Sequence, residues 1–270
     1  MTARVFPSKT KSPFHHEFLQ ACCMDQVHSF VDEKSVVLKA SIFPREKKFY
    51  EKLQTKREWL STQLFPPYFG AEIHNFGSGE KEYIKMANLL NGYQRPFVLD
   101  LKIGTHKYDP EIDPAKIEYR THVKIFTTTL ELGLRFCGMK RVIGGQLISY
   151  DKHMSRNEVK TSAQLFEYIK LFFNDGTKYR KEMLPFYINQ IDKLLSLLET
   201  MNYKFFGSSV LLVYDADATP ESQKYDLRFI DFAKSYSLDE EKCEMEDGIV
   251  YGLKHLKTIF ENLNKELKEE

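Results

Sequence analysis

An acidic and a basic side chain stand two positions apart in residues 96–104, which read PFVLDLKIG. Apolar residues recur at every second position, which is the pattern of a strand with one buried face. Asp100 and Lys102 therefore lie on the other face, roughly 6–7 Å apart along the strand. An acid and a base side by side on a rigid strand that ends in a glycine indicate a chemical role. The alternative is a salt-bridged pair on a half-exposed strand.

A second lysine lies in the middle of an apolar stretch near the start of the chain. Lys39 stands in the sequence VVLKA, which is typical of a strand rich in β-branched residues. A buried lysine needs a counter-charge, and a nucleotide phosphate is one candidate. Glu46, in the helix predicted next, is placed to pair with it, as a strand lysine and a helix glutamate do in protein kinases. The alternative is a lysine on the solvent face of an edge strand.

A single carboxylate ends the apolar run RFIDF near the end of the chain. Asp231 stands between Ile230 and Phe232, where a buried charge is costly unless an opposite charge meets it. Mg²⁺ is the match that we expect, because it is held by one or two carboxylates together with substrate phosphates. The alternative is a salt bridge with Arg228 or Lys234.

Basic residues follow the segment that carries Asp100 and Lys102. A helix predicted over residues 115–132 would align Lys116, Arg120 and, nearly, Lys124 on one face. Charges of one sign stacked in this way repel each other, and a ligand that carries several phosphates would reverse the repulsion. The alternative is a solvated basic face.

The elements that must position these residues predict an α+β chain with a cleft between two lobes. A first lobe over residues 1–95 holds a small antiparallel sheet and a helix and ends in the lobe connector. A second, larger mixed lobe over residues 96–270 includes a helical segment at about 105–132. The predicted helices and strands, in chain order, are a strand over 35–40, a helix over 44–60, strands over 72–76, 82–90 and 96–103, a helix over 115–132, strands within 134–150, helices over 161–173 and 185–203, strands over 209–215 and 227–232, and a helix over 248–267.

Composition limits the classes of protein that the chain can belong to. With 270 residues and 42% hydrophobic content it can bury a sizeable core, and a net charge of +1 argues against a general polyanion binder. The four cysteines form no C-x-x-C pair, so we expect no zinc site and free thiols in a reducing compartment. The sequence has no Walker A loop, no G-x-G-x-x-G, none of the protein-kinase tripeptides and none of the common hydrolase motifs.

An ordered set of motifs resembles the inositol polyphosphate kinases, between about Val36 and Leu256. The signature P-x-x-x-D-x-K-x-G occupies residues 96–104. The other matching segments are PRE with FYE at 44–51, LRFCGM at 134–139, GSSVLL at 207–212, IDFA at 230–233, and DG with YGLKHL at 247–256. Each motif is weak alone, and their order and spacing carry the resemblance.

The resemblance implies a two-lobed fold related to ATP-grasp proteins and protein kinases, with ATP and Mg²⁺ as cofactors. Lys39 would contact the ATP phosphates, Asp100 the ribose hydroxyls, and backbone groups of the connector from Met86 to Asn88 the adenine. The connector departs from the family in one respect, because Ala87-Asn88 stands where an acidic pair is usual.

The same resemblance assigns the reacting region and the second substrate. Lys102 would act between the substrate and the γ-phosphate, and Asp231 would hold Mg²⁺. Lys116 matches a substrate-phosphate lysine. The remaining expected substrate contacts are Lys102, Arg120, Lys124 and Lys160. Arg120 stands where other members have glutamine, which raises the local positive charge.

Two features bear on the substrate. Residues 99–105, which end in Thr105, resemble the inositol hexakisphosphate kinases, whose product is a pyrophosphate, whereas Tyr108-Asp109-Pro110 is more similar to the inositol polyphosphate multikinases. We predict a hexakisphosphate kinase that tolerates less phosphorylated inositols. The alternative within the family is a multikinase or trisphosphate kinase acting on ring hydroxyls.

Two hypotheses of other classes remain beside the kinase. One is a catalytically silent inositol-phosphate sensor, and the other is a peripheral membrane or RNA binder that uses the basic helix. We expect a monomer in the cytoplasm, with the nucleus as a further location, whose partners are ATP and inositol phosphates. We expect neither nucleic-acid binding nor an integral membrane segment.

Overall fold

A computed structural model describes residues 4–6, 27–28, 35–77, 79–106, 108–114, 116–117, 128–151, 158–219, 222 and 224–269. Helices and strands are mixed along the chain and the paired strands are antiparallel, so the α+β prediction is confirmed. The elements are β1 (Arg4–Phe6), β2 (Val27–His28), β3 (Val36–Ala40), α2 (Pro44–Gln54), α3 (Arg57–Leu60), β4 (Tyr68–Asn75), β5 (Glu80–Ala87), β6 (Pro96–Ile103), α5 (Thr129–Leu132), β7 (Leu134–Ile143), β8 (Gln146–Tyr150), α7 (Ser162–Phe172), η1 (Lys181–Met183), α8 (Leu184–Thr200), β9 (Tyr203–Phe205), β10 (Ser209–Asp215), β11 (Tyr225–Ile230), β12 (Ser235–Ser237) and α9 (Ile249–Glu269).

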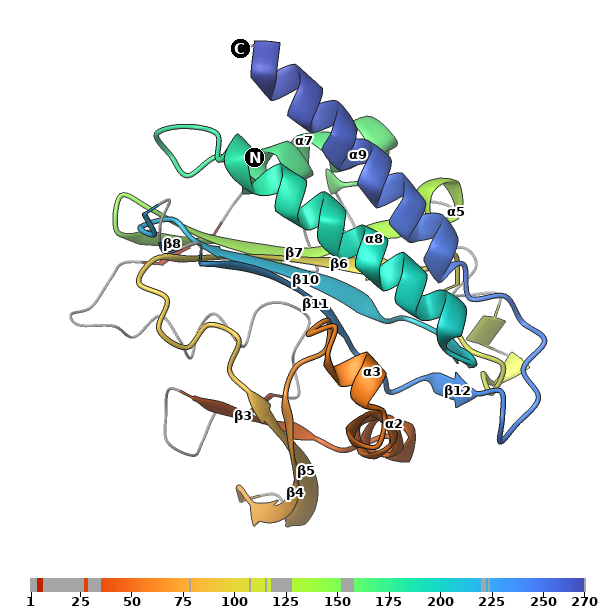
Figure 1. The fold of residues 1–270 in the computed structure, drawn as a ribbon. Helices are drawn as coiled ribbons and strands as arrows, with labels where there is room; N and C mark the ends of the chain where they lie inside the picture. The colour runs from red at the N-terminus through yellow and green to blue at the C-terminus, as the bar shows by residue number, and fades with distance from the viewer. Residues whose placement is uncertain are drawn as a thin grey trace.

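The larger sheet carries the signature strand near its centre. Its strand order is β1-β8-β7-β6-β10-β11, and the helices α7, α8 and α9 cover one of its faces (Figure 1). In register, Lys102 of β6 lies opposite Arg135 of β7 and Ser209 of β10. The sequence predicted one buried face for this strand, but every residue of β6 except Lys102 is buried. That expectation was wrong because the second face of β6 is also covered.

The helical layer is held by apolar stripes at helical spacing. In α9, the inward residues Leu253, Leu256, Phe260 and Leu263 are each 0% exposed. Burying a side chain of this size contributes about 1.5–3 kcal/mol, so this stripe fixes α9 firmly on the sheet. Gly104 ends β6 close to the start of α9, with φ of 109°, and a Cβ there would lie 2.7 Å from the carbonyl oxygen of Asp247. Only glycine fits this close approach.

The smaller sheet has the order β2-β3-β5-β4 and lies on the other side of the larger sheet from α8 and α9 (Figure 1). Lys39 lies opposite Ile84 of β5. Helix α2 begins with Pro44, whose fixed φ suits a first helical position. Its buried face, which includes Phe49, packs toward the shared core.

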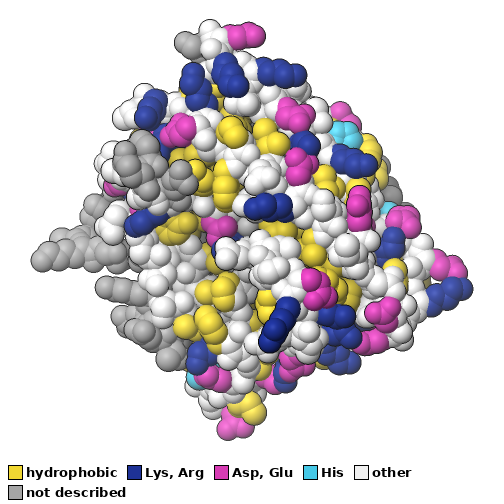
Figure 2. All heavy atoms as spheres, viewed as in Figure 1, with side chains coloured by type: hydrophobic (Ala, Val, Ile, Leu, Met, Phe, Trp, Pro, Cys, Tyr) yellow, Lys and Arg dark blue, Asp and Glu magenta, His cyan; other side chains and the backbone are white. Residues whose placement is uncertain are grey.

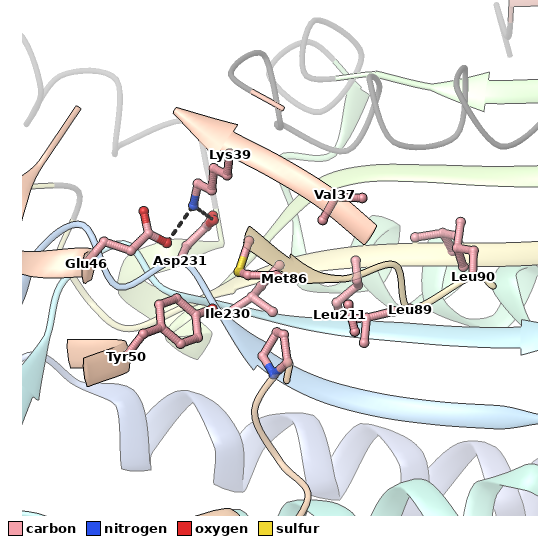
Figure 3. A pocket seen from close by; sticks show the side chains of 13 residues that line it. Val37, Lys39, Glu46, Tyr50, Met86, Leu89, Leu90, Leu211, Ile230 and Asp231 are labelled. Atoms are coloured by element: carbon pink, nitrogen blue, oxygen red, sulfur yellow. Dashed lines mark hydrogen bonds and ion pairs between the residues drawn. The ribbon is translucent and has the colours of Figure 1, made fainter. Parts of the chain in front are cut away.

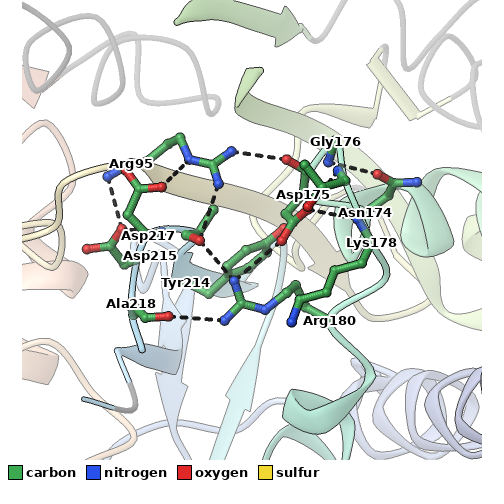
Figure 4. Close-up of polar contacts among 12 residues, drawn as sticks. Arg95, Asn174, Asp175, Gly176, Lys178, Arg180, Tyr214, Asp215, Asp217 and Ala218 are labelled. Carbon is green, nitrogen blue, oxygen red and sulfur yellow. Dashed lines mark hydrogen bonds and ion pairs between the residues drawn. The ribbon is translucent and has the colours of Figure 1, made fainter. Parts of the chain in front are cut away.

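The connector between the sheets is anchored where it enters β6. The Asp215 carboxylate accepts hydrogen bonds from the backbone N–H groups of Gln94 and Arg95, at 2.8 and 3.0 Å. The guanidinium groups of Arg95 and Arg180 both donate to the carbonyl of Ala216, at 3.2 and 2.9 Å (Figure 4). These bonds fix the end of the connector to β10 and to the loop before α8.

Several predicted boundaries differ from the structure. The helix expected over 185–203 ends at Thr200, because Met201 is extended and Tyr203 instead pairs with Ser237 in a two-stranded sheet. The helix expected over 44–60 is interrupted between α2 and α3 at Thr55. Most of the helix expected over 115–132 lies outside the described residues, and its end is the separate helix α5.

Two further expectations concern the chain outside the core elements. The boundary predicted between residues 95 and 96 stays a prediction, and β1 from the first part pairs with β8 of the larger sheet. Of the two described cysteines, Cys243 is free and Cys137 is disulfide-bonded, so the expectation of free thiols is wrong for Cys137. None of the helices in the described ranges is long and apolar enough to span a membrane.

Candidate active site

Two lysines from different sheets meet one aspartate where β11 ends. The Nζ atom of Lys39 lies 2.9 Å from Oδ1 of Asp231, and that of Lys102 lies 2.7 Å from Oδ2. The Lys102 ammonium also donates to the Ser209 hydroxyl at 3.0 Å. The structure therefore brings together three side chains that the sequence singled out separately.

The alternative partners of Asp231 are engaged elsewhere. Arg228 pairs with Asp226 at 2.7 Å, and Lys234 pairs with Asp109. The simple salt bridge considered for Asp231 is therefore not the one that forms.

Glu46, in the first turn of α2, contacts both Lys39 and the backbone next to Asp231. Its Oε1 atom lies 2.7 Å from the Lys39 Nζ atom, as predicted, and also accepts a bond from the backbone N–H of Phe232 at 3.3 Å. Glu46 is only 3% exposed, so its charge depends on these partners. It therefore holds the lysine and the peptide that follows Asp231 in one arrangement.

The backbone of Asp231 is in the left-handed region, with φ of 68°. This conformation costs a residue other than glycine about 1–2 kcal/mol, and aspartate is one of the few that tolerate it. The buried hydroxyl of Ser208 donates to the Asp231 carbonyl at 2.7 Å and holds the turn. Residues held in such conformations cluster at functional sites.

The charges of the group shift the pKa values of its members. Burial alone would raise the pKa of Asp231, but Lys102 and Lys39 hold it well below its usual range. Burial alone would lower the pKa of Lys39, but Asp231 and Glu46 raise it above its usual value. Asp231 and Lys39 are therefore both charged at neutral pH.

Asp100 lies on the same strand face as Lys102 but does not pair with it. It is 0% exposed, and neither carboxylate oxygen makes a hydrogen bond of normal geometry with a described residue. Burial raises the pKa of Asp100 to about 6, although the charge of Lys102 and the nearby Ser209 hydroxyl oppose the rise. Asp100 lies opposite Leu211 of β10 and is not among the residues that line the apolar pocket between the sheets.

An apolar pocket extends from the charged group along the space between the sheets. Lys39, Glu46 and Asp231 form its polar end (Figure 3). The apolar walls come from the small sheet, α2, the connector and the larger sheet, namely Val37, Tyr50, Pro66, Met86, Ala87, Leu89, Leu90, Val98, Leu211 and Ile230. A flat apolar slot with charges at one end is the shape that a nucleotide base and its phosphates require.

The connector offers the pocket a different backbone group from the one predicted. Met86 lines the pocket, but the N–H of Asn88 donates to the Ser35 carbonyl at 2.8 Å, and Asn88 is not in the wall. The Asn88 side chain turns back to accept the N–H of Leu90 at 3.0 Å. The N–H of Leu89, next in the chain, makes no hydrogen bond to any described residue. Leu89, which lines the pocket, therefore has a backbone donor available for a ligand.

Only some of the residues predicted to bind the second substrate lie in the described part of the chain. Lys116 is exposed, with the carboxylate of Asp113 4.0 Å away, and Lys160 is exposed just before helix α7. Arg120 and Lys124 lie outside the described residues. The face of the molecule seen in Figure 2 carries acidic and basic side chains interspersed, as the near-zero net charge predicts.

A comparison with protein families matches the model described as inositol polyphosphate kinase to residues 83–261. The chain belongs to the inositol polyphosphate kinase family. The match includes Lys102 and Asp231, whereas Lys39 and Glu46 come before it.

Curated relatives of this family member include two mammalian proteins. Inositol hexakisphosphate kinase 3 of Mus musculus is 28% identical over 205 residues, which are 68% of this chain and 51% of the relative. Inositol hexakisphosphate kinase 2 of Homo sapiens is 28% identical over 228 residues, 70% of this chain and 53% of the relative. The chain thus spans about half the length of these relatives.

Solved structures of the family share the fold. The crystal structure of inositol phosphate multikinase Ipk2 from S. cerevisiae, in complex with ADP and Mn²⁺, superposes with a TM-score of 0.71 at 22% identity and covers 84% of this chain and 98% of that one. A second structure of an inositol phosphate multikinase gives a TM-score of 0.64 at 19% identity, over 81% and 99% of the two chains. The predicted kinase-like fold is therefore confirmed.

The donors available for a metal in this family member are few. The described residues contain no group of three or more His, Cys, Asp or Glu side chains that could hold an ion. Asp231 supplies one carboxylate at the polar end of the pocket, and each of its oxygens accepts a bond from a lysine. One carboxylate fits Mg²⁺ when nucleotide phosphates supply further ligands. The two lysines would then turn from Asp231 to the phosphates.

Sequence reasoning missed four contributors to the site. They are the second bond of Glu46, the Ser208 hydroxyl that donates to the Asp231 carbonyl, the Ser209 hydroxyl beside Lys102, and the N–H of Leu89. The GSSVLL motif was recognised, but nothing in its spacing indicates that one serine meets Asp231 and the next meets Lys102. Which connector N–H stays available depends on the hydrogen bond from Asn88 to the Ser35 carbonyl, a tertiary contact that the sequence does not indicate.

Proposed function

We propose that this protein is a kinase that transfers the γ-phosphate of ATP to an inositol polyphosphate in the presence of Mg²⁺. The observation that carries the proposal is the convergence of Lys39 and Lys102 on Asp231, at the charged end of an apolar pocket. Membership of the family supports the same reaction. The crystallised relative that binds ADP and Mn²⁺ is consistent with a nucleotide and a divalent metal at this place.

The chain's own residues would bind and neutralise charge. The adenine would enter between Val37, Met86 and Leu211, with the N–H of Leu89 as its backbone donor. Lys39 would bind the nucleotide phosphates, held in place by Glu46. Lys102 would lie where the γ-phosphate meets the second substrate.

In phosphoryl transfer the protein contributes mainly by positioning the reactants and neutralising charge. The bond between the γ-phosphorus and its bridging oxygen breaks, a bond to a substrate oxygen forms, and ADP leaves. Mg²⁺, held by Asp231 and the phosphates, would supply neutralising charge during this transfer. If the attacking oxygen belongs to a phosphate it is already ionised, so no general base is required. The ribose contact of Asp100 stays a prediction, and it requires the fully buried carboxylate to become accessible beside the pocket residues Val98 and Leu211.

We propose inositol hexakisphosphate as the main substrate, with a pyrophosphate as the product. Relatives named inositol hexakisphosphate kinases support this choice, together with Thr105 after the signature and the basic residues Lys116, Arg120 and Lys124. Lys160 is a further candidate contact. A multikinase or trisphosphate kinase that acts on ring hydroxyls is the alternative within the family.

The test is a turnover assay on the purified full chain with ATP, Mg²⁺ and inositol phosphates carrying three to six phosphates. The products are separated by charge, and a species more highly charged than the hexakisphosphate is expected. Turnover of a trisphosphate alone would reverse the substrate assignment. Tight binding of the hexakisphosphate without ATP consumption would indicate the sensor.

Lys102→Ala is the decisive variant, with Lys204→Ala as its matched control. Each lysine side chain is 19% exposed and forms an ion pair, but Lys204 pairs with Glu246 away from the pocket. The first variant should lose turnover by orders of magnitude while it stays folded, and the second should keep it.

A further inference from the structure

The loop that follows the signature strand, residues 108–112, is fastened at Asp109. This side chain is 8% exposed and pairs with the ammonium of Lys234, just beyond Asp231. The hydroxyl of Tyr236, on β12, is a second partner. Asp109 Oδ1 also accepts the N–H of Glu111 at 3.1 Å, which shapes the loop internally. One end of the 108–112 loop is thus held by the strand after the candidate metal ligand.

Arg45, in the first turn of α2, also fastens this loop. One guanidinium nitrogen donates to Glu111 and the other to Glu241, in the segment after β12. The guanidinium also lies over the Tyr236 ring, 4.1 Å from its centroid. Helix α2, which carries Arg45, lies beside β12 (Figure 1). Arg45 therefore joins three segments that are distant in the sequence.

Arg45 is adjacent in the chain to a residue of the charged group around Lys39. Its neighbour Glu46 holds Lys39 and the N–H of Phe232. Two consecutive residues in the first turn of α2 thus contact the nucleotide side and the 108–112 loop. A shift of this turn must move both, because helical neighbours are rigidly linked.

We propose that Arg45 is a positioning residue that sets the 108–112 loop, and with it Lys116, against the nucleotide side of the site. The expected effect of Arg45 on substrate KM values rests on the proposed function, whereas its effect on the 108–112 loop does not. Glu111 is 63% exposed, so its ion pair alone would contribute little. The planar guanidinium makes two bonds and a ring contact at once, which a lysine cannot reproduce.

The first test is amide hydrogen exchange on the full chain without ligand. Arg45→Gln should speed exchange across residues 108–114 by about three- to tenfold, the range expected for losing one or two partly exposed ion pairs. Lys47→Gln is the matched control, since Lys47 lies on the same helix and pairs with Glu82 of the small sheet. The control should leave exchange in the 108–114 segment unchanged.

The second test separates the two substrates kinetically. Arg45→Gln should raise the KM for inositol hexakisphosphate by about three- to tenfold and leave the KM for ATP within about twofold. Arg45→Lys should give an intermediate value. Glu111→Gln should reproduce most of the effect, and the double variant should add little to either single one.

The positioning role of Arg45 can be rejected whether or not the chain has kinase activity. Unchanged exchange at 108–114 in both Arg45→Gln and Glu111→Gln would overturn it, whether or not the parental chain turns over a substrate. A rise in the two KM values by the same factor, or fully additive effects in the double variant, would also overturn it. If Arg45→Gln does not fold, Glu111→Gln decides the question alone, because its side chain is largely exposed.

Discussion

Lys39 and Asp231 are 192 positions apart in the chain, and their charged atoms lie 2.9 Å apart. This ion pair joins the small sheet to the end of β11 in the larger sheet. Because Glu46 holds Lys39 from the other side, the lysine has two acidic partners in a nearly buried place. A nucleotide phosphate entering here would replace one acidic partner with another, so the site is already arranged for an anion.

Replacing this lysine tests the nucleotide side of the site. Lys39→Met should raise the KM for ATP at least tenfold, because a phosphate contact is lost. It should also lower the free energy of unfolding by about 1–3 kcal/mol, since Glu46 would remain buried with its main partner gone. Steady-state kinetics and urea unfolding measure the two effects. Lys85→Met is the control, as Lys85 pairs with Glu72 on the same sheet outside the pocket. An unchanged KM for ATP in folded Lys39→Met would contradict the assigned role.

The aspartate can be tested with a neighbour of similar exposure. Asp231→Asn should cut turnover by orders of magnitude and abolish its saturation with Mg²⁺, because a neutral amide is a poor ligand for a hard cation. Asp226→Asn, five positions earlier on β11, is the matched control. Their side chains are 21% and 24% exposed, and both are paired with basic residues.

Binding measurements separate a metal role of Asp231 from a role in holding the inositol phosphate. Asp231→Asn should still bind inositol hexakisphosphate, as measured by calorimetry, because the proposal places Asp231 on the metal side. A folded Asp231→Asn variant with near-parental turnover would remove the metal role.

The pairing of Lys39 with Glu46 could be predicted because both belong to neighbouring elements. A strand lysine followed by a helix with glutamate in its first turn leaves few other arrangements. The helix stripes and the alternation of β6 were predicted for the same reason, since they depend on local periodicity.

The partner of Lys102 could not be predicted from the strand that carries it. The only partner that the sequence offered, as the alternative to a chemical role, was Asp100 two residues away on the same face, whereas the ammonium reaches Asp231. That choice depends on how β10 places Ser209 beside Lys102 and on the left-handed turn at Asp231. Both are tertiary features, so neither leaves a periodic trace in the sequence.

The basic segment offers a test of substrate binding. Lys116→Ala should raise the KM for the inositol phosphate by about three- to tenfold and change kcat little, as expected for losing one charged contact made in both ground and transition state. Lys242→Ala is the control, because Lys242 is also exposed and pairs with Glu244. Equal effects of the two variants would indicate a general loss of positive charge rather than a contact of Lys116.

The buried carboxyl of Asp100 makes a prediction about stability that is independent of activity. Its pKa is raised to about 6 in the folded chain, against 3.8 as the ordinary value. Between these pH values the folded protein keeps the proton that the unfolded chain has lost, so this group's contribution to stability falls as pH rises and is constant above about pH 6. Asp100→Asn cannot ionise, so its free energy of unfolding relative to the parent should increase from pH 4 to pH 7, by on the order of 3 kcal/mol. Urea unfolding of both proteins at several pH values measures the difference. A difference independent of pH would show that Asp100 is ionised throughout and that its charge is compensated by Lys102.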